Sequence, residues 1–145
     1  MNAHFSCSAI FCDDIRQELQ GKMSLMGIYN GSMYVPVFPI VLSKICSFFE
    51  LRVSADFSAN ADAILTVMKG AERINSITIP LSPFDSTIEL PHGKRAVAFS
   101  KMGAMEFPAM TFDEPTLLEV VVQVNGQSVV AGRLWVTQFP QADEI

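Results

Sequence analysis

Apolar and polar residues alternate along this chain in short runs that turn-forming residues separate. The runs cover residues 4–12, 22–29, 32–38, 44–55, 63–70, 73–80, 94–100, 105–112, 116–124 and 128–138. Alternation is the pattern of a strand with one buried face, and no segment sustains a helical period over about 12 residues. The pattern predicts an all-β fold, a sandwich of two mainly antiparallel sheets in a single domain over residues 1–145.

The clearest hairpin lies between Thr116 and Val136. Asn125–Gly126 favours a type I′ turn, because both central residues of that turn need positive φ. Unbroken pairing from this turn would place Arg133 opposite Leu118 on the core face. One extra residue beside Gly132 corrects the register, so the sequence predicts a β-bulge there.

Residues 13–21 are open to two interpretations. One is a single helical turn with Asp14 as N-cap. The other continues the first strand to a tight turn at Gln20–Gly21, from which a second strand returns over residues 22–29. Acidic residues disfavour strands, but seven residues make a short helix, and the hairpin is favoured.

The same stretch, FCDDIRQELQGKMSLMGIY, resembles the opening motif of a family of small bacterial proteins of unknown function. The shared positions are Cys12, Asp13, Asp14, Arg16, Glu18, Gly21, Lys22, Ser24, Leu25, Gly27, Ile28 and Tyr29. The resemblance covers about 20 of the 145 residues. It implies a compact β-rich bacterial protein and brings no activity with it.

Composition narrows the function classes. Hydrophobic residues make up 50% of the chain and charged residues 17%, and the net charge is −5. This excludes a disordered chain, and the absence of a basic stripe argues against nucleic acid and against anionic membranes as partners. No run reaches the length of a membrane span or a secretory signal. Three cysteines at irregular spacing, Cys7, Cys12 and Cys46, indicate reduced thiols and a cytoplasmic location.

Candidate metal ligands are few. Asp13 and Asp14 could converge with Asp56 and Asp62 from another loop to bind calcium, which takes six to eight oxygens. However, adjacent strand residues point to opposite faces. The favoured interpretation is therefore that the two aspartates belong to a connecting segment that is solvated or salt-bridged, with Arg16 or Lys22 as partner. Cys7 and Cys12 face opposite sides of one strand and cannot share an ion.

Catalytic motifs are also missing. Two isolated histidines give a nucleophile–base–orienter triad few ways to form, and the chain has no glycine-rich phosphate loop. We therefore expect no enzymatic activity and no cofactor. The favoured function is a non-catalytic interaction or assembly module. The alternative is a carboxylate-based hydrolase, or a sandwich that binds carbohydrate or calcium.

A partner surface is expected because an apolar chain with few charges must cover its outward apolar residues. The hairpin over 116–138 would point Leu117, Val121 and Trp135 outward. A second stretch, 98–112, combines methionine with phenylalanine, which suits either core filling or an adaptable surface. The interface candidates are Leu117, Val121, Trp135, Met102, Met105 and Phe107, and the expected assembly is a homo-oligomer, most simply a dimer.

Overall fold

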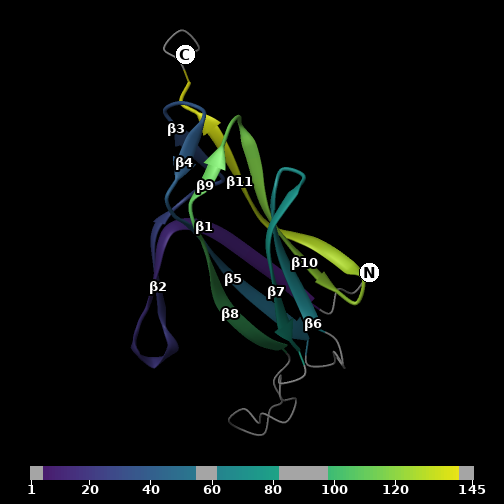
Figure 1. Cartoon of the computed structure of the whole chain (residues 1–145). Helices are drawn as coiled ribbons and strands as arrows, with labels where there is room; N and C mark the ends of the chain where they lie inside the picture. The colour runs from purple at the N-terminus through teal and green to yellow at the C-terminus, as the bar shows by residue number, and fades with distance from the viewer. Residues whose placement is uncertain (1–4, 55–61, 82–97, 141–145) are drawn as a thin grey trace, which may run out of the picture.

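The computed structural model describes residues 5–54, 62–81 and 98–140. The elements are β1 (Phe5–Gln17), η1 (Leu19–Gly21), β2 (Met23–Ile28), β3 (Ser32–Val35), β4 (Ile40–Leu42), β5 (Ile45–Ser54), β6 (Asp62–Lys69), β7 (Glu72–Pro80), β8 (Ala98–Phe107), β9 (Met110–Phe112), β10 (Thr116–Val124) and β11 (Gln127–Gln138). Apart from η1, a short 3₁₀ turn, all of these elements are strands (Figure 1). The all-β prediction is confirmed.

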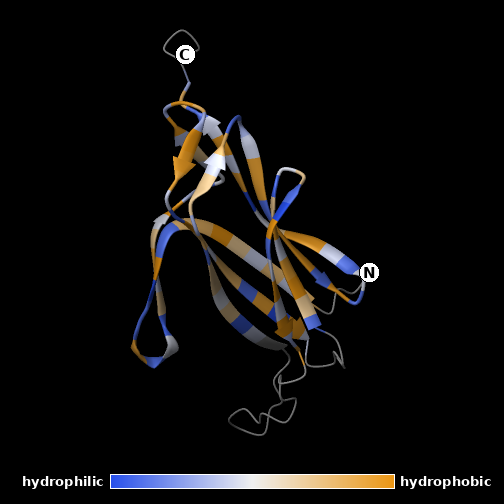
Figure 2. Ribbon diagram, in the orientation of Figure 1, coloured by the Kyte–Doolittle hydropathy of each residue, from blue (hydrophilic) through white to orange (hydrophobic). Residues whose placement is uncertain are grey.

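Two sheets form the sandwich, and a small third sheet lies at one end. The first has the order β2-β1-β5-β8, the second β3-β11-β10-β6-β7, and the third pairs β4 with β9. All pairings are antiparallel except that of β3 with β11. Buried and more exposed side chains alternate along much of β1 and β10, one strand from each large sheet, and Figure 2 shows orange and pale bands along β1. The buried faces of the two sheets meet in one hydrophobic core.

The core takes its largest fully buried side chains from both large sheets and from β9 of the small one. They are Phe11, Phe107, Phe112, Ile45, Leu51, Leu65, Leu118, Leu134, Val67, Val120, Val122 and Val124. A buried apolar side chain contributes about 1.5–3 kcal/mol relative to an exposed one, so this set dominates the stability of the fold. Within the described ranges, no helical segment has the length and apolar character that crossing a membrane demands.

The β10–β11 hairpin has the predicted bulge. Val121 pairs with Val130 but Val120 pairs with Gly132, so Ala131 is the extra residue. The shift turns Leu134 into the core, where it is fully buried. At the bulge, a Cβ on Gly132 would lie 2.2 Å from the carbonyl oxygen of Ala9 in β1. At the bulge, β11 therefore lies directly against the backbone of the facing sheet.

Two predictions about strands have different outcomes. The first hairpin is confirmed, since β1 runs on to Gln17 and turns through η1 into β2. The strand β3, which Pro36 follows directly, lies at the edge of the five-stranded sheet, where prolines are tolerated. The expectation of separate strands at 94–100 and 105–112 is wrong for the described residues, because β8 runs unbroken through Gly103. The ring of Phe49 lies over Gly103, and a Cβ there would be 2.4 Å from that ring.

Candidate functional site

The two adjacent aspartates near the end of β1 point in opposite directions. On one face, the Tyr29 hydroxyl donates a hydrogen bond to Asp13 Oδ1. The Asp13 carboxylate also fills the space over Gly27, where a Cβ would lie 2.3 Å from Oδ2. Gly27 has φ +67°, a conformation that favours glycine. Burial, and then the hydrogen bond to Asp13, raise the pKa of Tyr29 to about 12, so its hydroxyl stays a donor.

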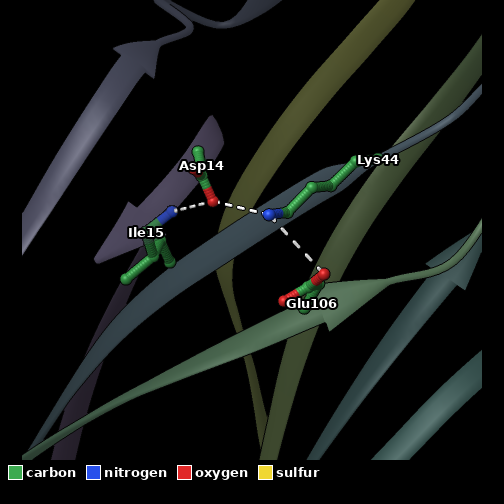
Figure 3. Close-up of polar contacts among 4 residues, drawn as sticks. All are labelled: Asp14, Ile15, Lys44 and Glu106. Atoms are coloured by element: carbon green, nitrogen blue, oxygen red, sulfur yellow. Dashed lines mark hydrogen bonds and ion pairs between the residues drawn. The ribbon is translucent and has the colours of Figure 1, made fainter. Parts of the chain in front are cut away.

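Asp14 belongs to a small ionic group on the other face. Lys44 donates a hydrogen bond to Asp14 Oδ1 at 2.6 Å and lies 3.6 Å from Glu106 Oε1 (Figure 3). The backbone N–H of Ile15 donates to the same Asp14 oxygen at 2.9 Å. The prediction of Arg16 or Lys22 as partner is wrong: Lys44 continues the β1–β5 register to the position opposite Asp14.

The candidate calcium ligands that the structure describes, Asp13, Asp14 and Asp62, do not lie together in one place. Asp13 and Asp14 are engaged as described, Asp62 begins β6 in the other sheet, and Asp56 lies outside the described residues. Across the part of the chain that the structure describes, no group of three or more histidine, cysteine or acidic side chains could hold a metal ion. Asp13 thus packs within the hairpin, against Gly27 and Tyr29, whereas Asp14 links the hairpin to Lys44 just before β5.

Other motif residues also contact one another inside this hairpin. Ser24 Oγ donates to Glu18 Oε1 at 3.1 Å, and the Glu18 N–H donates to the Lys22 carbonyl at 2.7 Å. These are contacts between the two arms and the turn that joins them. The charged stretch that interrupts the apolar pattern therefore builds a strand pair that extends to the side of the sandwich (Figure 1).

The predicted interface residues divide among three places. Leu117, Val121 and Trp135 lie on the outer face of the five-stranded sheet, where Leu117 is directly opposite Trp135. Met102 lies on the outer face of the four-stranded sheet and is 48% exposed. Met105 and Phe107 are buried in the core, so they are not available to a partner in this fold and fill the core instead.

The sequence analysis missed two aromatic residues that lie near Trp135. Tyr34 of β3 stacks on Phe139, with ring centroids 5.7 Å apart and planes 21° from parallel. Because β3 pairs with β11 in parallel, Tyr34 is opposite Thr137 and shares the outer face with Trp135. Tyr34, Trp135 and Phe139 form what we term the aromatic strip, with exposed fractions of 50%, 42% and 57%. Tyr34 and Phe139 are far apart in sequence, so no local pattern indicates their contact.

Hydrogen bonds hold this strip in place from below. The Phe139 N–H donates to the Val35 carbonyl at 3.0 Å, and the Trp135 N–H donates to the Gly31 carbonyl at 2.9 Å. The Gln138 side chain donates to the Pro36 carbonyl at 3.1 Å. On the same face, Arg133 and Glu119 form an ion pair at 2.9 Å. This pair lies two residues along the strands from the facing pair of Trp135 and Leu117. The aromatic strip thus lies on a hydrogen-bonded backbone, with polar groups beside it.

These features define an all-β sandwich with a polar hairpin at one side and exposed aromatic side chains on one sheet. The model of a family of unknown function, DUF6941, matches residues 7–137, and the chain belongs to this family. The matched range includes the aspartate pair, Lys44 and Trp135, while Phe139 lies just beyond it. No curated protein was found to match the chain.

Proposed function

We propose that this protein is a non-catalytic interaction module that assembles with a second copy of itself through the aromatic strip. The observation that carries the proposal is the exposure of three large aromatic rings on one sheet face. Apolar surface of this kind, beside polar groups, has the composition of interface centres, which are enriched in tyrosine, tryptophan and phenylalanine.

The support beneath the strip favours binding. Tyr34 and Phe139 are held by their stacking and by the backbone hydrogen bond from Phe139 to Val35. Binding through side chains that are already ordered loses less conformational entropy than binding through mobile ones. The strip therefore combines apolar area with a low ordering cost.

A second copy is the simplest occupant. A two-fold axis through the strip makes one surface cover its own copy, with no separate partner surface required. Leu117 adds an aliphatic neighbour to Trp135, and the Arg133–Glu119 ion pair supplies both charges at the border. When a two-fold axis relates the two copies, Arg133 of one copy can lie beside Glu119 of the other. A stable interface of this kind would bury about 800 Å² on each copy.

The test is light scattering coupled to size exclusion over a tenfold dilution series. We expect wild type at high concentration to have twice the 15.9 kDa chain mass. Trp135→Thr should have the single-chain mass at the same concentration. Val130→Thr is the matched control. Val130 lies on the same strand and the same face as Trp135 and is also 42% exposed. The Arg133–Glu119 ion pair separates it from the aromatic strip.

Two results would contradict the proposal. One is a wild-type mass of 15.9 kDa at every concentration. The other is a dimer that Val130→Thr weakens as much as Trp135→Thr, since this would place the interface elsewhere. Threonine is chosen at both positions because it favours strands and should leave the fold intact.

A further inference from the structure

Two of the three cysteines lie directly opposite each other on neighbouring strands. Cys12 of β1 pairs with Cys46 of β5 in the antiparallel ladder of the four-stranded sheet. Residues directly opposite in such a ladder point to the same face, with Cα atoms about 4.5–5.5 Å apart. Disulfides span Cα separations of about 4.4–6.8 Å, so this position suits one.

Neither cysteine of this pair forms a disulfide in the structure, and both side chains are buried. Cys12 and Cys46 are free, with exposed fractions of 0% and 2%. Cys7 is also free but points to the other face of β1, where its ladder partner is Leu51. The sequence indicates three reduced thiols, and the structure separates them into a facing pair and a single cysteine.

We propose that Cys12 and Cys46 are a redox site that closes to a disulfide by exchange with a small-molecule disulfide such as oxidised glutathione. The thiolate of one cysteine attacks a glutathione sulfur and releases one reduced glutathione. The second cysteine then attacks the mixed disulfide and releases another. The two protein thiols lose two electrons and two protons in all, and oxidised glutathione takes them up as its own S–S bond breaks.

The edge strand β2 controls access to the pair. Burial, and then the neighbouring Cys46, raise the pKa of Cys12 to about 11, so exchange is slow while the thiols are covered. Ile28 of β2 is the ladder neighbour of Cys12 on the side away from β5. No side chain of β2 is buried, and a strand with so few core contacts opens at low cost. Opening of β2 uncovers Cys12 without unfolding the sandwich.

A Cys12–Cys46 disulfide would join β1 to β5 and close the loop of chain between them. The loop between the two cysteines contains β2, β3 and β4, including the edge strand that carries Tyr34. A cross-link restricts the unfolded chain, so the oxidised protein should melt at a higher temperature than the reduced one. The cross-link joins strands that are already paired, so it preserves the native register.

To test this, the folded chain is equilibrated in glutathione buffers that range from fully reduced to fully oxidised. Each sample is then quenched with acid, alkylated and analysed by mass spectrometry. Trypsin leaves Cys7 and Cys12 on one peptide, residues 1–16, so the mapping uses Cys7→Ser. We expect a single link between peptides 1–16 and 45–52, a mass lower by two hydrogens and a higher melting temperature. Wild type should keep one free thiol.

Cys46→Ser is the second variant. It should abolish the link and leave Cys12 as a glutathione adduct or a free thiol. The proposal is overturned if Cys7→Ser stays fully reduced, or carries only glutathione adducts, in the most oxidising buffer. A wild-type disulfide that includes Cys7 would overturn it equally. None of these outcomes depends on self-association, which the mass of Trp135→Thr tests separately.

Discussion

Asp13 and Gly27 face each other across the first hairpin, and the position of each depends on the other. The carboxylate lies where a side chain at residue 27 would lie, and it accepts the Tyr29 hydroxyl there. The three residues belong to the charged motif, whose composition suggests a metal or catalytic site. Their contacts form a packed unit within the hairpin, in which a short acidic side chain lies over a glycine.

Gly27→Ala should therefore destabilise the protein more than Gly21→Ala. Both glycines lie in the same hairpin at positive φ, +67° and +71°, but a Cβ at residue 21 meets no atom within 4 Å. Gly21→Ala should cost about 1–2 kcal/mol from backbone strain alone. Gly27→Ala should cost about 1–3 kcal/mol more, because it displaces the carboxylate and its hydrogen bond. Urea unfolding measures both, and equal losses would show that Asp13 does not occupy this space.

The Asp14–Lys44 pair makes stability depend on pH at both ends of the range. The hydrogen bond from Lys44 lowers the pKa of Asp14, and Asp14 in turn raises the pKa of Lys44. The Asp14 contribution is present above the unfolded carboxyl pKa, about 3.9, and is lost as the pH falls through the lower folded value. The Lys44 contribution is present below about pH 10.4 and is lost as the pH rises further.

Asp14→Asn should lower stability at pH 7 and flatten the loss of stability below about pH 4. Urea midpoints between pH 7 and pH 3 measure this effect. Asp113→Asn, at an exposed carboxylate before β10, serves as the control. If the two variants flatten the acid limb equally, the effect comes from general charge and the account of the pair is wrong.

At the scale of elements, the bulge in β11 joins the two sheets. Gly132 has no positive φ that would call for glycine, yet a Cβ there would collide with a backbone carbonyl of β1. Gly132→Ala should lower the free energy of unfolding by about 1–3 kcal/mol, because a backbone atom cannot rotate away. Ser128→Ala, on the exposed part of the same strand, should change it by less than about 0.5 kcal/mol. A neutral Gly132→Ala would mean that the sheets are not in contact there.

The sequence predicts elements well where the deciding contacts are local. Asn125–Gly126 determines the turn, and the position of Arg133 reveals the bulge, because a charge on the core face must be avoided. The unbroken strand through Gly103 was not predictable, since the covering ring of Phe49 comes from a neighbouring strand. For the same reason, the partner of Asp14 and the stacking of Tyr34 on Phe139 join residues that no local pattern connects.

At the scale of the whole molecule, the two outer sheet faces differ. The outer face of the five-stranded sheet carries the aromatic strip beside the Arg133–Glu119 ion pair. The strip lies at the end of the sandwich where β3, β4 and the end of β11 come together (Figure 1). The four-stranded sheet carries the Asp14–Lys44–Glu106 group and the facing cysteines instead. Assembly and thiol chemistry would therefore use different faces and can be tested independently.

Fluorescence of Trp135 tests the central claim most directly, because it is the chain's one tryptophan and lies within the proposed interface. Light scattering reports whether the chain associates, whereas the emission maximum reports whether this ring is covered when it does. The account predicts blue-shifted emission at high concentration and a red shift on dilution, with the same midpoint as the fall in mass. A fall in mass without any shift in emission would contradict the account, because association would then use another surface.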